Sequence, residues 1–249
     1  MSVHPDELIY SAHMGTNDEL FPKILQLYIP IGSKVADVTY GKGVFWREVP
    51  PNAYDLYATD IENDPPVDCR DLPYPDNSMK GVVLDPPYMH NSGETSYDSH
   101  QNYQEYYRNQ NLSTGKYHEG VLDLYFKAAE EAHRVLKEEG CLIVKCQDEV
   151  CANRQRLTHV ELVCYLEDEL GFVCEDLFVL VRQNRPGVSR MKTQRHARKN
   201  HSYFLVFRNP KGKKRWEGLE DNNLMEVEGE VRPKEPDTDS FGSYMENLD

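Results

Sequence analysis

An α/β fold, with a mostly parallel sheet and helices on both faces, is predicted by three features of this sequence. Short apolar runs rich in β-branched residues end at polar or acidic positions, as the strands of open α/β sheets do at their ligand-binding edge. Segments with apolar side chains at helical spacing lie between these runs. The length of 249 residues suits one such domain with a tail. We expect the domain over residues 1–212 and the tail over residues 213–249.

A helix is expected before the first predicted strand. Its apolar face comprises Phe21, Ile24, Leu25 and Tyr28. Thr16 or Asn17 would be its N-cap, because both side chains can accept a hydrogen bond from the first turn.

The first predicted strand runs from Lys34 into a turn with two glycines. Residues 37–43 read Asp-Val-Thr-Tyr-Gly-Lys-Gly, and glycines one residue apart (Gly41 and Gly43) allow the backbone to approach a ligand closely. A Gly-x-Gly alone also occurs in ordinary loops. Here a second strand-like run, residues 53–58, follows and leads to Asp60. An acid at the end of the second strand, about 20 residues after a glycine turn, suits the hydroxyl pair of a ribose.

The most informative segment is Asp-Pro-Pro-Tyr at residues 85–88, directly after the apolar run 81–84. Two prolines cannot continue a sheet, so Asp85 and Tyr88 would project from the carboxyl end of a strand. The carboxylate of Asp85 and the carbonyls of Asp85 and Pro86 make this corner rich in acceptors, and Pro87 has no N–H. The corner suits a planar ligand with an exocyclic amine, such as a nucleobase. The alternative is a strand that simply ends at proline with an exposed tyrosine.

The remaining elements alternate in the same way. A helix is predicted over residues 121–136 and up to Gly140, a strand over 141–146 and a second helix over 157–170. Two further strands are predicted over residues 176–181 and 202–207.

These motifs resemble those of class I S-adenosylmethionine-dependent amino-methyltransferases, the family that methylates exocyclic amines of adenine or cytosine in DNA. The likeness spans roughly residues 10–208 and is densest at residues 35–88. Asp-Pro-Pro-Tyr at residues 85–88 agrees with the catalytic motif of that family without a substitution. The resemblance implies a seven-stranded, mostly parallel, Rossmann-like sheet with a reversed last strand. One departure is Thr39-Tyr40, where an aromatic residue followed by a small one is commoner.

The resemblance also implies site residues. Asp37, Gly41 and Gly43 would line the methionine side of the cofactor, Asp60 its ribose and Asp68 its adenine. The full set of implied cofactor contacts is Asp37, Thr39, Tyr40, Gly41, Gly43, Asp60, Ile61, Asp68 and Cys69. The segment before the first helix would run under the methionine end, where His13, Thr16 and Asn17 either touch the cofactor or only cap the helix.

The implied catalytic residues are Asp85, Pro86, Pro87 and Tyr88. The lone pair of a nucleobase amine is delocalised into its ring, which makes the amine a poor nucleophile. Hydrogen bonds from the amine to the Asp85 carboxylate and the Pro86 carbonyl would favour a pyramidal nitrogen, while Tyr88 stacks on the base. A base inside a duplex would have to be flipped out at a cost of a few kcal/mol.

Residues 182–201 form a predicted basic hairpin between the last two strands, with seven Arg or Lys and no acid. We expect it to bind the phosphate backbone of a nucleic acid. The candidate contacts are Arg185, Arg190, Lys192, Arg195, Arg198 and Lys199. The alternative is a solvated loop that balances the acidic tail, in which residues 217–249 hold 11 acids and two bases. Residues 89–117, rich in tyrosine and amides, would form a substrate loop or lid.

Composition limits the remaining classes. The net charge of −14 comes mostly from the tail, which is expected to be a solvated, disordered segment, with mimicry of nucleic-acid charge as an alternative. The sequence holds no apolar run long enough to span a bilayer, and its six cysteines lack a Cys-x-x-Cys pair. We therefore expect a cytoplasmic protein with buried thiols and no required metal. A zinc site from Cys141, Cys146 and Cys151 is a minor alternative.

The function predicted from these features is methylation of the adenine N6 amine in DNA, with S-adenosylmethionine as cofactor. Methylation of cytosine N4 or of an RNA base by the same mechanism is the first alternative, because the motif does not separate them. A non-catalytic partner subunit that binds nucleic acid ranks lower. A protein-glutamine methyltransferase would be expected to have Asn rather than Asp at position 85.

Overall fold

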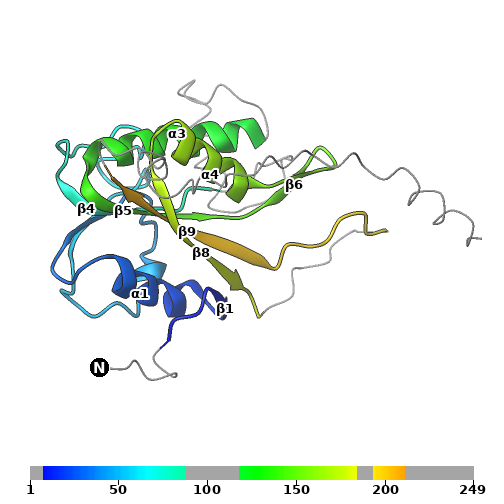
Figure 1. Ribbon diagram of the computed structural model, residues 1–249, viewed down its shortest axis with the longest axis horizontal. Helices are drawn as coiled ribbons and strands as arrows, with labels where there is room; N and C mark the ends of the chain where they lie inside the picture. The colour runs from blue at the N-terminus through cyan, green and yellow to red at the C-terminus, as the bar shows by residue number, and fades with distance from the viewer. Residues whose placement is uncertain (1–7, 88–117, 184–192, 211–249) are drawn as a thin grey trace, which may run out of the picture. The chain divides into compact units, whose positions relative to one another are not determined.

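The computed structural model describes residues 8–87, 118–183 and 193–210 of the chain (Figure 1). Several predictions concern residues outside these ranges. They are Tyr88, the loop 89–117, the part of the hairpin with Arg185, Arg190 and Lys192, and the tail 213–249. None of the described helices is long and apolar enough to cross a membrane.

In the described part of the chain, seven strands form one sheet in the order β1-β8-β9-β5-β4-β2-β3. The strands are β1 (Ala12–Met14), β2 (Lys34–Asp37), β3 (Asp55–Ala58), β4 (Met79–Leu84), β5 (Leu136–Cys146), β8 (Val173–Val181) and β9 (His201–Asn209). Every neighbouring pair is parallel except those made by β9, which runs antiparallel to both β5 and β8. The predicted mostly parallel sheet with a reversed last strand is confirmed.

Helices cover both faces of this sheet, as predicted. Figure 1 shows α1 (Asn17–Tyr28) on one face and α3 (His118–Val135) and α4 (Thr158–Asp168) on the other. A 3₁₀ turn, η2 (Val44–Trp46), packs with α1, and a separate hairpin consists of β6 (Glu149–Cys151) and β7 (Arg154–Arg156). We call the two sides the α1 face and the α3/α4 face.

Each face has its own core because side chains alternate along the strands. Val35, Val83 and Ile143 pack with α1 and η2 on the α1 face. Their chain neighbours Ala36, Val82, Leu84, Leu142 and Val144 pack with α3 and α4 on the other. This alternation decides which face receives the side chain that follows each strand, and it therefore positions the site described below.

Helix α1 begins where its sequence predicts. Thr16 is its N-cap, and the carboxylate of Glu19 accepts a hydrogen bond from the Thr16 N–H at 2.8 Å, which completes a capping box. Leu20, Phe21, Ile24 and Leu25 are buried, so the predicted apolar face is the packed one.

Two element boundaries were predicted wrongly. Helix α3 ends at Val135 and β5 already begins at Leu136, whereas the helix was expected up to Gly140 and the strand from Cys141. The intervening Lys137, Glu138 and Glu139 are exposed and polar, so they carry no strand pattern. Their pairing is irregular, because Met79 of β4 pairs with Leu136 and Gly81 already pairs with Cys141.

The segment expected to precede the first strand contains a strand of its own. The three residues of β1 pair in parallel with β8 at the sheet edge, from Ala12 opposite Val179 to Met14 opposite Val181. A strand of three residues is too short to show a period of two in the sequence. Hairpin β6–β7 was not predicted for the same reason, and its turn residues Ala152 and Asn153 both have positive φ.

Candidate active site

The carboxyl ends of β5, β4, β2 and β3 lie side by side, because these strands are adjacent and parallel. Asp85, Asp37 and Asp60 stand at the ends of β4, β2 and β3, so the predicted site acids meet at one edge of the sheet. Asp37 and Asp60 are buried and Asp85 is half-buried. Ligands of open α/β folds bind at this edge.

The glycine turn after β2 depends on its two glycines. Gly41 and Gly43 have φ of +52° and +64°, in the region that L side chains rarely adopt. A Cβ on Gly43 would also lie 2.6 Å from Cζ of the Tyr40 ring, so Tyr40 packs over the place where a side chain would be. The turn is closed by a hydrogen bond from Gly43 N–H to the Tyr40 carbonyl at 2.8 Å.

Asp60 connects this turn to β3. One carboxylate oxygen accepts a hydrogen bond from Gly41 N–H at 2.7 Å, and the other accepts from Glu62 N–H at 2.9 Å. Each oxygen has a second lone pair, so the carboxylate can still accept from hydroxyl groups. The neighbouring Ile61, another predicted cofactor contact, has a buried side chain.

Asp37, the last residue of β2, holds both ends of the glycine turn. Its carboxylate accepts hydrogen bonds from Trp46 Nε1–H at 2.7 Å and from Thr39 N–H at 3.2 Å. Burial raises the pKa of Asp37 to about 7 against the effect of these two hydrogen bonds, and the negative charges of Asp85 and Asp60 add to the rise. The acids at this edge therefore repel one another, and the edge favours a cationic ligand.

Thr39 explains the departure of this turn from the commoner family pattern. Its hydroxyl oxygen accepts a hydrogen bond from the backbone N–H of Asp85 at 2.7 Å. The glycine turn and the Asp-Pro-Pro segment are thus tied together across two strands. An aromatic residue at position 39 would have no acceptor for this N–H.

A second support, Tyr125 of α3, was missed by sequence reasoning, which counted it only as part of an apolar helix face. It is fully buried, and its hydroxyl donates to the Lys145 carbonyl at 2.7 Å and lies 3.5 Å from the Pro86 carbonyl. A buried tyrosine usually finds a hydrogen-bond partner. That rule was the available signal, but it does not say which carbonyl accepts.

Asp68 is held by a neighbour instead of being left open. Its carboxylate pairs with the Arg70 guanidinium, with Nη2 at 2.7 Å and Nε at 3.0 Å, and also accepts from Arg70 N–H at 2.9 Å. A hydrogen bond from Val67 N–H to the Asp60 carbonyl brings this segment beside the end of β3. Cys69, the other predicted contact here, is buried in the core of the α3/α4 face.

The described part of the basic hairpin begins at the same edge of the sheet. Tyr203 of β9 pairs with Cys146 at the carboxyl end of β5, and Arg182 N–H donates to the Asn200 carbonyl at 2.8 Å. Arg195 and Arg198 are exposed and Lys199 is half-buried. The cations at the described base of the hairpin therefore lie on the site side of the sheet.

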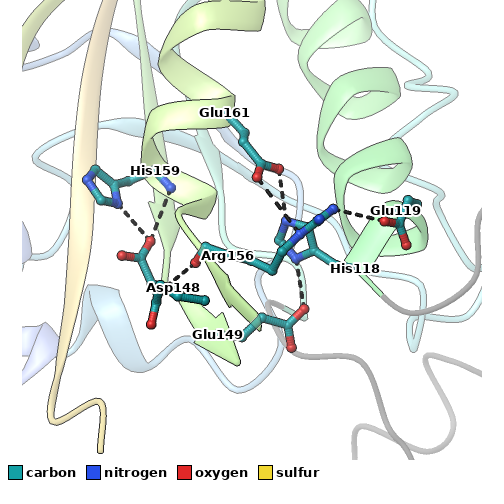
Figure 2. A network of polar contacts seen from close by, with 8 residues as sticks. His118, Glu119, Asp148, Glu149, Arg156, His159 and Glu161 are labelled. Carbon is teal, nitrogen blue, oxygen red and sulfur yellow. Dashed lines mark hydrogen bonds and ion pairs between the residues drawn. The ribbon is translucent and has the colours of Figure 1, made fainter. Parts of the chain in front are cut away.

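A polar network surrounds the start of α3 at this edge (Figure 2). The fully buried His118 ring lies between two carboxylates, with Nδ1 2.8 Å from Glu149 and Nε2 2.9 Å from Glu161. Burial disfavours the charged ring, but the two glutamates outweigh this effect and raise the pKa of His118. Nearby, His159 Nδ1 lies 2.7 Å from Asp148 and Arg156 donates to Glu119 at 2.8 Å. We call these residues the His118 cluster.

The cysteines do not gather into a metal site in the structure. Cys141 packs in the core of the α1 face, whereas Cys146 packs in the core of the α3/α4 face. Within residues 8–87, 118–183 and 193–210, no group of three His, Cys, Asp or Glu is arranged to hold a metal ion.

The residues that fit S-adenosylmethionine are those around the glycine turn. A ribose needs hydroxyl acceptors, for which the carboxylate of Asp60 is suited, and a sulfonium and an ammonium group need nearby negative charge, for which Asp60 and Asp85 are suited. The Gly41 position is open, with no atom closer than 4.0 Å to an added Cβ.

The sequence of residues 79–242 matches the profile of a DNA methylase family that groups N6- and N4-methyltransferases. The match includes the Asp-Pro-Pro-Tyr segment and begins after the glycine turn. Among curated proteins, none matches this chain.

Solved structures that match this chain include the following three. The PvuII cytosine-N4-specific DNA methyltransferase is 14% identical over 57% of this chain and 47% of its own, with a TM-score of 0.41. A SAM-dependent methyltransferase from Methanosarcina mazei is 12% identical over 74% and 96%, with a TM-score of 0.45. The cyclase SpnF is 16% identical over 78% and 81%, with a TM-score of 0.48.

This chain spans about half the length of the DNA methylase structures that it matches. At these TM-scores the structural likenesses assign neither a substrate nor the role of any residue. The family therefore follows from the sequence match over residues 79–242.

Proposed function

The chain belongs to this DNA methylase family of N6- and N4-methyltransferases, and we propose from that membership that it methylates the exocyclic N6 amine of adenine in DNA. The methyl donor of the family is S-adenosylmethionine. One observation supports the proposal most strongly. The glycine turn that suits the donor and the acceptor-rich end of β4 are joined by the hydrogen bond from Asp85 N–H to Thr39.

The proposed roles follow from the contacts at this edge. Asp60 would accept hydrogen bonds from the ribose of S-adenosylmethionine, and the turn through Gly41 and Gly43 would pass close to its methionine portion. Asp37 would act mainly through the turn, because its two oxygens already accept from Trp46 and Thr39. Asp68 would hold Arg70 and the surrounding segment in place. It would contact the adenine of the cofactor in addition to the hydrogen bonds that it makes to Arg70.

The substrate amine would donate its two N–H groups to the Asp85 carboxylate and the Pro86 carbonyl. These bonds favour a pyramidal nitrogen whose lone pair is available, and they strengthen as the nitrogen becomes cationic. S-adenosylmethionine supplies an electrophilic methyl group when it is bound. Tyr125 and Thr39 would keep the two acceptors in place, because they hold the backbone on both sides of Asp85. Tyr88 is proposed to stack on the base.

DNA is proposed as the polymer on two grounds, the family and the basic segment 182–201. Arg195, Arg198 and Lys199 would contact phosphates, together with Arg185, Arg190 and Lys192 of the same segment. Such contacts carry no sequence information. Because they are ionic and release counterions from the phosphates, binding should weaken steeply with salt. Cytosine N4 is the alternative amine, since Asp85 and Pro86 would accept from it in the same way, and RNA is the alternative polymer.

The proposal is tested by mass spectrometry of nucleosides from DNA and RNA incubated with the protein and methyl-labelled S-adenosylmethionine. Label on deoxyadenosine that disappears in Asp85→Ala supports it. The matched control is Asp55→Ala, which removes an exposed carboxylate from the opposite end of β3 and should retain the label.

Other outcomes change specific parts of the proposal. Label on deoxycytidine or on a ribonucleoside would keep the site and change the substrate. Label that persists in Asp85→Ala would contradict the role of Asp85. Cofactor binding without label on either polymer would favour a non-catalytic subunit that needs a partner.

A further inference from the structure

Lys145 is a buried cation at the candidate active site to which the proposed reaction gives no role. It lies in β5, where the preceding Val144 pairs with Leu84, so Lys145 stands beside Asp85 of the neighbouring strand. Its side chain is 1% exposed. Lysine is almost never fully buried unless it is paired.

Contacts place the ammonium of Lys145 on the α1 face. Nζ donates to Asn17 Oδ1 at 2.8 Å, and it lies 4.9 Å from the ring centroid of Phe204 and 5.7 Å from that of Phe45. Both rings belong to the core of the α1 face. Asp85 stands two residues after Val83, which also packs on this face, so strand alternation directs both side chains to the same side of the sheet.

Packing alone does not account for this lysine. Burying an ammonium is unfavourable, and an apolar side chain of similar volume often replaces a buried charge without loss of stability. The aromatic rings and the Asn17 amide offset part of that cost. Burial lowers the pKa of Lys145, and the charge of Asp85 opposes this effect and favours the charged ammonium. Because this attraction is mutual, the ammonium must favour the ionised form of Asp85 to the same extent.

We propose that Lys145 is a positioning residue of the methyl-transfer site, and that its ammonium, held in place by Asn17, keeps Asp85 ionised among the neighbouring acids. The effect on the pH range of activity rests on the proposed function, whereas the effect of Lys145 on the ionisation of Asp85 does not. A protonated Asp85 would lose one of the two acceptor groups that orient the amine. Lys145 therefore extends the pH range of activity toward acid.

Several other groups lie around Asp85 and Lys145 and have to be considered with them. Asp37 at the end of β2 and Cys146 in β5 interact with the charge of Asp85, and Asp60 acts with Asp85 on Asp37. Tyr125 of α3 contacts the Pro86 carbonyl, and Arg182 after β8 acts on Lys145. The charge of Asp37 opposes ionisation of Asp85, and burial raises the pKa of the Cys146 thiol well above its ordinary range. Tyr125 donates to a backbone carbonyl. Arg182 is exposed and therefore screened by solvent.

The first experiment is an NMR titration of ¹³C-labelled aspartate carboxyls in Lys145→Met and the wild-type protein, with resonances assigned through Asp85→Asn. The titration midpoint of Asp85 should rise by about one pH unit in Lys145→Met, which is about a tenfold change in its ionisation equilibrium. Lys145→Arg should return it toward the wild-type value. Lys34→Met, an exposed lysine at the amino end of β2, is the matched control and should leave it unchanged.

Single-turnover methyl transfer to DNA over a range of pH gives the catalytic readout. The acidic limb of the profile should move up by the same amount in Lys145→Met, so that the rate near that limb falls about tenfold. A loss of rate equal at every pH, with an unchanged Asp85 midpoint, would show a purely structural role and overturn the inference. If the wild-type protein methylates no DNA but the Asp85 midpoint still moves, the proposed function fails and the electrostatic inference stands.

A second variant covers the case in which Lys145→Met does not fold. The reciprocal titration follows the Lys145 ammonium in Asp85→Asn, where the loss of the carboxylate charge should lower its midpoint. An identical Lys145 midpoint in wild type and Asp85→Asn would contradict the coupling.

Discussion

The cluster around Asp85 lies on the α1 face of the sheet, whereas the His118 cluster lies on the face covered by α3 and α4. Both bury charged groups near the same edge, but they satisfy them differently. His118 touches two carboxylates directly, at 2.8 and 2.9 Å, so its charge is compensated by contact. Around Asp85, the ammonium of Lys145 bonds to the amide of Asn17, and N–H groups donate to the acids. Burial, together with the neighbouring acids, raises the pKa of Asp37.

The difference separates a cluster built for stability from one built for binding. Fully paired charges rigidify a fold, and breaking them is expensive. Acids that repel one another are tolerated where a ligand supplies the missing positive charge. We therefore expect changes in the His118 cluster to act on unfolding and changes around Asp85 to act on methyl transfer.

The largest effect is expected for Asp85→Asn. Loss of the negative acceptor should lower single-turnover methyl transfer by about 10³-fold, the scale seen when one preorganised hydrogen-bond partner of a transition state is removed. The melting temperature should change little, because Asp85 is half-buried and its backbone contact to Thr39 remains. A rate within tenfold of wild type would contradict the expectation that changes around Asp85 act on methyl transfer.

His118→Leu tests the structural side. Removal of the ring takes away the cation that Glu149 and Glu161 both contact and leaves Arg156 Nε at 4.0 Å from Glu161, so the free energy of unfolding should fall by about 3 kcal/mol. Urea unfolding monitored by circular dichroism measures it. Arg156→Met in the same network is the control, since its solvent-accessible ion pairs with Glu119 at 2.8 Å and Glu161 at 4.0 Å should contribute less than about 1 kcal/mol.

The same cluster predicts a pH dependence of stability. The pKa of His118 is raised in the folded protein, so its contribution is complete below the unfolded value of about 6.5 and is lost as pH rises through the folded value. Unfolding experiments above pH 6.5 should show this decline in wild type. Its persistence in His118→Leu would assign the decline to another group.

Gly43→Ala should act on both stability and cofactor binding. A non-glycine residue at φ +64° costs about 1 kcal/mol, and the contact with the Tyr40 ring adds a similar amount. We expect about 2 kcal/mol less stability and weaker binding of S-adenosylmethionine in calorimetry. Gly32→Ala is the control, because its φ is also positive but an added Cβ there meets nothing within 4 Å.

The smallest effect is expected for Thr39→Val, which removes the acceptor of the Asp85 N–H while keeping the shape of the side chain. The loss of one hydrogen bond should cost about 1 kcal/mol and reduce methyl transfer several-fold. Thr39→Ser keeps the hydroxyl and should behave as wild type. Equal rates for Val and Ser would show that this tie between the two motifs does not position Asp85.

The sequence by itself predicted α1, α3, α4, the longer strands and the strand ends that carry Asp37, Asp60 and Asp85, whereas the reversed last strand was implied by the resemblance to a methyltransferase family. The predicted elements depend on local patterns, because a strand ends at its prolines and a helix shows its spacing within a few turns. The sequence did not predict β1, because three residues are too few to show alternating apolar and polar side chains. It did not predict the early start of β5, because Lys137, Glu138 and Glu139 are all exposed and polar.

Only the tertiary structure decided how the site is supported. Thr39 bonds to Asp85, Tyr125 contacts Pro86 and Asn17 bonds to Lys145. The partners of these pairs lie 39 to 128 residues apart in the sequence, and no local pattern links them. In the sequence, Tyr125 is one residue of an apolar helix face and Lys145 is one residue of a strand, and nothing local marks either as part of a site. Their roles arise because the order β5-β4-β2 brings the carboxyl ends of three strands together, and because alternation sends Lys145 and Asp85 to the same face.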